Sequence, residues 1–353
     1  MTNPGLERLR ELLEQRLVPA ILVESAPLEL AAFQVRGEPI SLDEALRGDY
    51  RPFQVGEEWG PPWSTTWFRV RGRVPDGWLG REVAAVFDLG FIGPTGFTCE
   101  ALAWKDGLPW RAVDPNHRRL PILGQDVDFL LEAAANPWAT ESGPHPSLSM
   151  IALRESPIPI FTLTQAELRL VNQEARRVAL DFRVLLELAE ATGTSGAIAA
   201  LEKFEATGDA SALTEALSRP GGSRHLVTAV GHAHIDTAWE WPLREAKRKC
   251  ARSWSNQLAL MDEHADYVFA CSQPAQYAWM KESYPDIYDR LRARVAEGRW
   301  EPAGAMWVEP DCNLPSGESL VRQLLHGKRF FMKEFGREVK EVWLPDVFGY
   351  PGS

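Results

Sequence analysis

The alternation of short apolar runs with helical patterns after about residue 224 constrains the fold more than any other feature of the chain. The apolar runs predict strands within LVTAVGHAHID, YVFACSQ, WEPAGAMWVEP and EVWLPDVFGY. Apolar residues three and four apart predict helices between them, with Pro285 bending or splitting the second helix and with Ser316 and Gly336 bounding the third. This alternation predicts a parallel sheet with helical crossovers, in which functional groups gather at the carboxyl ends of the strands.

Three of the four predicted strands end in groups that titrate or bind metal ions. These groups are His232, His234 and Asp236, then Glu309 and Asp311, and finally Asp346. Residues two apart in an extended strand share a face, so the first three side chains should point the same way. Imidazole and carboxylate together suit Zn²⁺ and related divalent ions, and Asp346 would join them where the strand ends meet. The alternatives are structural histidines and an aspartate that caps a turn or a helix.

Four regions are predicted along the whole chain. Apolar spacing in LERLRELLEQRL predicts an amphipathic helix, short apolar runs between Pro, Gly and Asp predict an antiparallel β domain, and a longer helical pattern begins at about residue 163. The regions are an N-terminal helix and lead-in at 1–30, a β-sandwich or jelly roll at 31–160, a helical connector at 161–223, and an α/β domain at 224–353.

Composition excludes several classes of partner. The net charge is -11 with charges of both signs mixed, so we expect no nucleic-acid partner, which would need a basic surface. No run of about 18 apolar residues and no apolar signal-peptide core occurs, so we expect no membrane span. Four widely spaced cysteines without a CxxC pair favour a reducing compartment, and we expect a cytoplasmic location. The oligomeric state stays open, with a homo-oligomer among the alternatives.

Fourteen tryptophans are an unusual number, and several stand beside Gly or Pro in the predicted β domain. One explanation is core packing. The other is stacking against the apolar faces of sugar rings, for which indole is a suitable platform.

Four segments together resemble the catalytic domain of glycoside hydrolase family 38, the α-mannosidases, and most closely the cytosolic and vacuolar type. In chain order they are GHAHIDTAWEW, SQPAQYAWM, EPAGAMWVEPDCNLPSGESLVRQ and VWLPDVFGY. The earlier segments WSTTWFRV and EALAWKDGLPWRAVDPNH resemble the β domain that precedes the catalytic domain in that subgroup. The resemblance implies an α/β fold class in which a β-sandwich-like domain and a helical connector precede part of a parallel (β/α)7-type barrel.

The family's site residues correspond to four positions of this chain. The resemblance implies one zinc ion, with Co²⁺ or Mn²⁺ as other candidates, bound by His234, Asp236 and Asp346. It also implies that Asp346 is the catalytic nucleophile and that Trp239 lines the sugar subsite. His232 belongs to the subgroup's signature, and we expect it to support the metal-bound groups from behind, as Glu309 and Asp311 would by lying near the pocket.

The implied activity is retaining hydrolysis of terminal α-mannosides, with a mannose-containing oligosaccharide as the partner. The sequence ends at Ser353, just after the nucleophile motif, whereas the family's second metal-binding histidine and its general acid lie later. We therefore expect a truncated chain that holds part of the barrel and is inactive alone on aryl α-mannosides, because leaving-group protonation would be missing.

Two other classes of protein compete with this hypothesis. An amidohydrolase-like or other metal-dependent hydrolase also carries HxH on a first barrel strand, although such enzymes need further histidines downstream. A carbohydrate-binding module without catalysis would explain the tryptophan-rich β domain.

Overall fold

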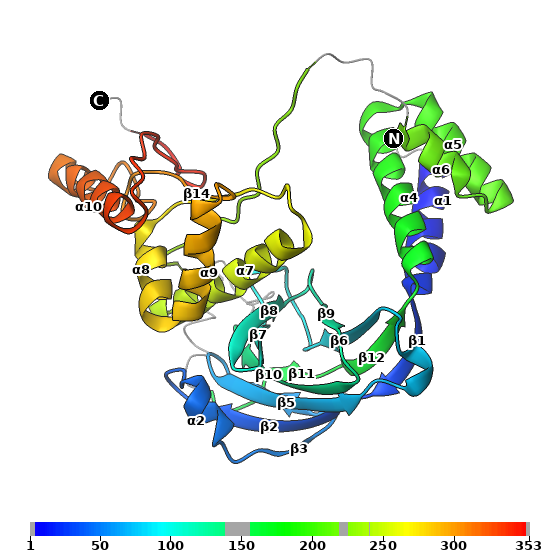
Figure 1. The fold of residues 1–353 in the computed structure, drawn as a ribbon, viewed down its shortest axis with the longest axis horizontal. Coiled ribbons are helices and arrows are strands. Elements are labelled where there is room, and N and C mark those ends of the chain that lie inside the picture. The colour runs from blue at the N-terminus through cyan, green and yellow to red at the C-terminus, as the bar shows by residue number, and fades with distance from the viewer. Residues whose placement is uncertain (1–3, 138–155, 219–224, 240, 351–353) are drawn as a thin grey trace.

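The computed structural model describes residues 4–137, 156–218, 225–239 and 241–350. An antiparallel sandwich forms one end of the molecule, and two separate groups of helices stand on it (Figure 1). One helical group contains the N-terminus, and the other contains the region around the predicted site.

The sandwich contains a six-stranded sheet, a four-stranded sheet and a short two-stranded ribbon, and every pairing within them is antiparallel. The six-stranded sheet has the order β3 (Arg51–Phe53), β2 (Glu29–Val35), β5 (Thr65–Arg73), β10 (Asp126–Ala134), β7 (Glu100–Lys105), β8 (Leu108–Val113). The four-stranded sheet has the order β1 (Leu22–Pro27), β12 (Gln165–Val171), β6 (Val83–Asp88), β9 (Arg119–Ile122). The ribbon pairs β11 (Phe161–Thr162) with β4 (Glu58–Trp59). The predicted sandwich is therefore confirmed.

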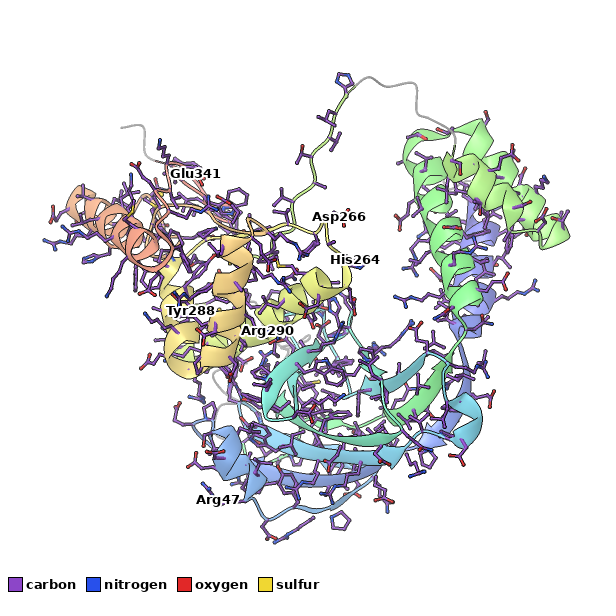
Figure 2. The ribbon with its side chains drawn as sticks, in the orientation of Figure 1. Arg47, His264, Asp266, Tyr288, Arg290 and Glu341 are labelled. Carbon is purple, nitrogen blue, oxygen red and sulfur yellow. The ribbon has the colours of Figure 1, made fainter. Side chains whose placement is uncertain are left out.

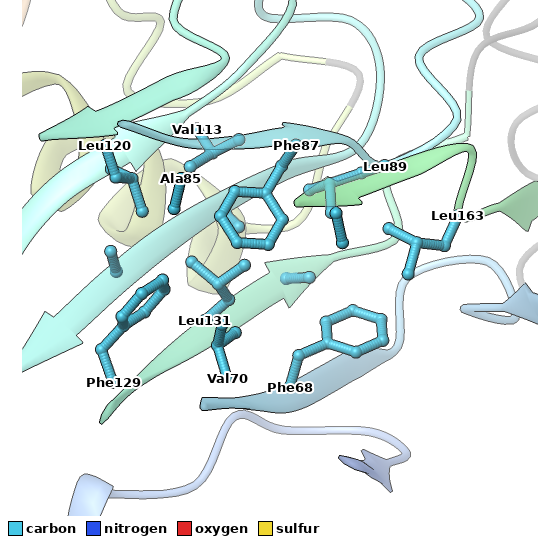
Figure 3. Close-up of a cluster of buried hydrophobic side chains, with 14 of the residues drawn as sticks. Phe68, Val70, Ala85, Phe87, Leu89, Val113, Leu120, Phe129, Leu131 and Leu163 are labelled. Carbon is cyan, nitrogen blue, oxygen red and sulfur yellow. The ribbon is translucent and has the colours of Figure 1, made fainter. Parts of the chain in front are cut away.

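Apolar side chains from the facing sheets fill the sandwich. Phe68 and Val70 of β5 face Ala85 and Phe87 of β6, and none of the four is more than 2% exposed (Figure 3). Alternate residues of a strand point to opposite faces, so β5 places its apolar residues inward along this stretch. Four tryptophans of this part of the chain are also buried, which favours core packing over sugar stacking for them: Trp59, Trp63, Trp67 and Trp78.

The helical pattern predicted from residue 163 is wrong at its beginning, because Gln165–Val171 forms the strand β12. Its apolar residues Ala166, Leu168 and Leu170 alternate with polar ones, and this period of two suits a strand between β1 and β6. The helix α4 (Gln173–Thr192) starts only after Asn172, whose side chain accepts a hydrogen bond from the backbone of Ala175. β1 and β12 thus extend the sandwich beyond residues 31–160 at both ends.

The N-terminal helices pack together on the four-stranded sheet. Their shared core includes Leu9, Phe182 and Leu201 together with Val86 of β6. The helices are α1 (Pro4–Leu12), α4, α5 (Ser195–Thr207) and α6 (Ser211–Ser218), and a shorter helix α2 (Leu42–Leu46) lies beside the sandwich. No helix in the described ranges is both long enough and apolar enough to span a bilayer.

The C-terminal region contains the predicted succession of helices. These are α7 (Leu243–Glu263), α8 (Pro274–Ser283), α9 (Pro285–Ala296) and α10 (Gly317–Phe335), with the strands β13 (Phe269–Cys271) and β14 (Trp300–Pro302) between them. β13 and β14 pair in parallel. The split at Pro285, the cap at Ser316 and the end at Gly336, whose backbone is left-handed, are all confirmed.

Two of the four predicted strands are not strands in the structure. LVTAVGHAHID makes one parallel bridge, from Gly231 to Phe269. In the segment after α10, the backbone carbonyl of Glu341, labelled in Figure 2, accepts a hydrogen bond from the backbone of Ala305, but no strand forms there. Apolar runs become strands only when a neighbouring strand pairs with them, and Leu226 and Val227 are 93% and 83% exposed with no such neighbour in the described residues. The parallel sheet described here therefore has two strands, and the barrel remains what the resemblance implies.

The backbone of Ala305 and Met306, just before Glu309, packs closely on α10. A side chain at Gly327 would collide with the backbone of Ala305 and Met306, whereas one at Gly317, on the same helix, would meet nothing within 4 Å. The helix can approach Ala305 only because position 327 has no side chain.

We predict that Gly327→Ala lowers the free energy of unfolding by about 1–3 kcal/mol, because the rigid backbone of Ala305 cannot move away. Gly317→Ala is the matched control and should be neutral or slightly stabilising. Denaturant unfolding of both variants measures the effect, and equal stabilities would contradict the prediction.

Candidate metal centre

The side chains of His234, Asp236 and Asp346 converge. His234 Nε2 lies 3.3 Å from Asp236 Oδ1 and 3.6 Å from Asp346 Oδ2. Ligand atoms of the three residues all lie within 4.8 Å of one another. Ligands about 2.1 Å from a zinc ion at tetrahedral angles stand about 3.4 Å apart, so these separations fit one divalent cation. The donor set of one imidazole and two carboxylates also suits such an ion.

Glu309 lies behind His234. Its Oε2 is 2.8 Å from His234 Nδ1, an ion-pair distance without the alignment of a hydrogen bond, and its side chain is only 5% exposed. The hydroxyl of Ser272 donates to its other oxygen. A carboxylate behind a metal-binding imidazole orients the ring and makes it a better ligand. The acidic neighbours Asp236 and Glu309 raise the pKa of His234 to about 10, so a cation at this position would compete with a proton for the ring.

His232 connects two segments of the site. Its Nδ1 donates to the carbonyl of Ala270 at 2.9 Å, and its Nε2 accepts a 3.4 Å bond from the indole of Trp343. Both ring nitrogens are therefore occupied. The ring thus links Ala270 of β13 to the indole of Trp343, three residues before Asp346. These two bonds do not include His234, Asp236 or Asp346, so the support that we expect His232 to give the metal-bound groups stays a prediction.

Gln273 connects the segment that carries His234 and Asp236 to the backbone of Glu309, a contact that the sequence did not predict. Its amide donates to the carbonyl of Ile235 at 2.9 Å, and its oxygen accepts from Thr237 and from the backbone of Glu309. The residue is 3% exposed and has a φ of 63°, a left-handed conformation that costs a non-glycine residue energy. The hydrogen bonds of Gln273 offset this cost, and the bond from the backbone of Glu309 also fixes the position of that residue.

The described contacts of Asp311 and Trp239 do not include the three converging side chains. Asp311 accepts hydrogen bonds from the backbone of Asn313 and Leu314, so its described contacts are those of a turn before α10. Trp239 is 49% exposed and contacts the rings of Phe97 and Trp241.

A cavity of about 430 Å³ opens beside the three converging side chains, and both halves of the molecule line it. The sandwich contributes Phe97, Asp114 and His117, and the C-terminal region contributes His234, Asp236 and Asp346 among others. No local pattern marks the three sandwich residues, because they come near the site only through long-range packing. A larger cavity of about 970 Å³ lies between α2 and the helices α7 to α9, away from the converging side chains.

Buried ion pairs attach α7 to the sandwich. Arg252 lies 2.8 Å from Glu100 of β7, and Arg248 lies 3.7 Å from Glu132 of β10. Both arginines also pair with Glu245 of α7 itself. Burial alone would raise the pKa of Glu245, but Arg252, Arg248 and Lys249 overcome that effect and lower it to about 2.

Comparison with known proteins gives two family matches. Residues 224–353 match the N-terminal domain of glycosyl hydrolases family 38, and residues 26–169 match the alpha-mannosidase jelly roll domain. Alpha-mannosidase 2C1 of Homo sapiens is 34% identical over 355 residues, covering 92% of this chain and 32% of the relative. Alpha-mannosidase G of Dictyostelium discoideum is 32% identical, covering 89% of this chain and 30% of the relative. Alpha-mannosidase of Saccharomyces cerevisiae is 31% identical, covering 88% of this chain and 31% of the relative. The chain thus spans about a third of the length of the relatives it matches.

Two residues that the sandwich contributes to the cavity wall, Asp114 and His117, form an ion pair whose charge depends on pH. His117 Nδ1 donates to Asp114, 2.8 Å from its Oδ2, and this bond raises the pKa of His117. Burial opposes ionisation of Asp114, but the bond from His117 outweighs it together with backbone donors, and the pKa of Asp114 is lowered. The charged pair therefore stabilises the fold above the ordinary pKa of Asp and below that of His, near 6.5, and its contribution is lost as pH rises through the raised pKa of His117.

We predict that His117→Gln lowers Tm by about 1–3 °C at pH 6 and by less than about 1 °C at pH 9, because a partly exposed pair is worth little. Thermal unfolding at the two pH values measures this difference. His326→Gln, at an exposed histidine of α10, is the control. An equal loss at both pH values for His117→Gln would contradict the prediction.

Proposed function

The chain carries the N-terminal domain of family 38 glycosyl hydrolases behind an alpha-mannosidase jelly roll domain, and from this premise we propose that it is part of a metal-assisted retaining α-mannosidase. The proposed substrates are terminal α-mannosides of oligosaccharides. The cytoplasmic location expected from the sequence belongs to the same proposal.

The observation that carries the proposal is the convergence of His234, Asp236 and Asp346 at separations that suit one divalent cation. We propose that these three residues hold Zn²⁺, with Co²⁺ or Mn²⁺ as alternatives. When bound, such an ion supplies Lewis-acid contacts to neighbouring hydroxyls, and the cis 2,3-diol of mannose is suited to them.

The remaining chemistry belongs to the side chains. A carboxylate has two oxygens, so Asp346 can bind the cation through one and attack the anomeric carbon with the other. We propose that the bond from C1 to the leaving oxygen breaks as the bond from C1 to Asp346 forms, while a general acid, which the resemblance places after residue 353, protonates the leaving oxygen. Water that gives its proton to the same group then displaces Asp346 and releases mannose with retained configuration. Glu309 orients the imidazole of His234, while Trp239, which is 49% exposed, offers its indole as a platform for the sugar ring.

The rival functions are distinguishable. An amidohydrolase-like enzyme would use the same cation without selecting between sugars that differ only at C2. A carbohydrate-binding module would bind mannosides through the sandwich alone, independently of the cation, but the burial of four sandwich tryptophans removes much of its basis.

We predict that the chelator-treated chain binds one Zn²⁺ and gains thermal stability, since a ligand that binds only the folded state stabilises it. Asp236→Asn and Asp346→Asn should each weaken binding at least about tenfold, because each removes a charged ligand. Asp311→Asn is the matched control, since an asparagine oxygen can accept the same turn hydrogen bonds. Isothermal titration with Zn²⁺ measures the affinities, and equal weakening by Asp311→Asn would count against the assigned ligands.

We also predict that the zinc-loaded chain binds methyl α-mannoside at least about tenfold more tightly than methyl α-glucoside, a difference of about 1.4 kcal/mol. The two glycosides differ only in the orientation of the 2-hydroxyl that the cation would contact. Titration calorimetry with each glycoside, with and without Zn²⁺, tests the substrate class. Equal affinities, or binding that is unchanged by metal removal, would contradict the proposal.

A further inference from the structure

The loop between β6 and β7, residues 89–99, extends from the sandwich to the predicted sugar platform. The rings of Phe97 and Trp239 form an edge-to-face pair, with centroids 5.2 Å apart and planes at 80°. It also lies 6.2 Å from Trp241, which is itself 5.2 Å from Trp239. We refer to these three side chains as the Phe97 cluster. Edge-to-face contacts of this kind give aromatic rings a preferred orientation.

The loop is attached to α7 by buried cations. Lys249 donates a 2.6 Å hydrogen bond to the carbonyl of Gly96 and lies 4.6 Å above the ring of Trp241. The backbone of Gly96 also donates to Glu100, the carboxylate that pairs with Arg252. Lys249 and Arg252 are 6% and 4% exposed, so these contacts form out of water, where they are strong. The position of Phe97 is therefore fixed relative to α7.

The same loop lines the cavity of the candidate metal centre. Thr95, Gly96 and Phe97 stand in its wall together with His234, Asp236 and Asp346. A hydrophobic contact made only for stability would bury its aromatic rings, yet Trp239 remains 49% exposed. A half-exposed indole held by neighbouring rings keeps part of its surface free for a ligand while losing rotamer freedom in advance of binding.

We propose that the sandwich forms one wall of the sugar site and that Phe97 is a positioning residue, which holds Trp239 in the orientation that stacks on a pyranose. This inference rests on the proposed function for the identity of the sugar. It assigns the sandwich a part in substrate binding through Phe97, not through its buried tryptophans. The site is then complete only when the sandwich and α7 are docked.

The test uses three variants of the full chain. Phe97→Ala removes the ring, Phe97→Tyr retains it, and Phe91→Ala removes a ring of the same loop that packs under Arg118 and does not line the cavity. The first readout is the ¹⁹F NMR line of Trp239 in chain labelled with 5-fluorotryptophan, identified by its loss in Trp239→Phe. The second is the affinity of the zinc-loaded chain for methyl α-mannoside.

Phe97→Ala should move the Trp239 line toward that of a free indole and weaken mannoside binding about three- to tenfold. Phe97→Tyr should restore both values, and Phe91→Ala should change neither. An unmoved Trp239 line in Phe97→Ala overturns the inference whatever the ligand result, as does unchanged affinity where the wild-type chain binds mannoside. If the wild-type chain binds no mannoside while the line moves as expected, the proposed function fails and the positioning of Trp239 by Phe97 stands.

Discussion

The docking of α7 on the sandwich depends on charges that cannot be left unpaired. Arg248, Lys249 and Arg252 are buried, and carboxylates of both the helix and the sandwich neutralise them. A buried ion pair adds little net stability, but removal of one partner costs about 3–5 kcal/mol because the other charge remains in a low-dielectric environment. The network therefore restricts how the helix and the sheets fit together, more than it strengthens their contact.

Because two parts of the site are attached to α7, the docking of this helix also restricts where they can lie. The segment that carries His234 and Asp236 leads directly into α7, and the loop that carries Phe97 is held by Lys249 of the same helix. Gln273 then connects that segment to the backbone of Glu309, and His232 connects it to the indole of Trp343, three residues before Asp346. The convergence of three distant parts of the sequence thus follows from a small number of specific bonds, and not from a continuous sheet.

The sequence predicted helix boundaries and candidate metal ligands, but it did not predict which distant segments pair as strands. Helix boundaries at Pro285, Ser316 and Gly336 depend on the residue itself, and the sequence predicted them. Strands depend on the strands that pair with them, so the prediction of a strand at Leu226 is wrong. The apolar residues of Gln165–Val171 fit a helical period and a strand period alike, and only the neighbouring strands decide between the two. The metal-type residues stood out by their chemistry. Phe97 did not, because only long-range packing brings it to Trp239 and to the cavity wall.

The central claim is that His234, Asp236 and Asp346 share one cation. X-ray absorption at the zinc edge, measured on the zinc-loaded chain, tests it most directly. The account predicts a first shell of nitrogen and oxygen at about 2.0–2.2 Å with the outer-shell signal of one imidazole, and loss of one oxygen in Asp346→Asn. A sulfur ligand at about 2.3 Å, or a spectrum unchanged by that substitution, would show that the ion is bound elsewhere.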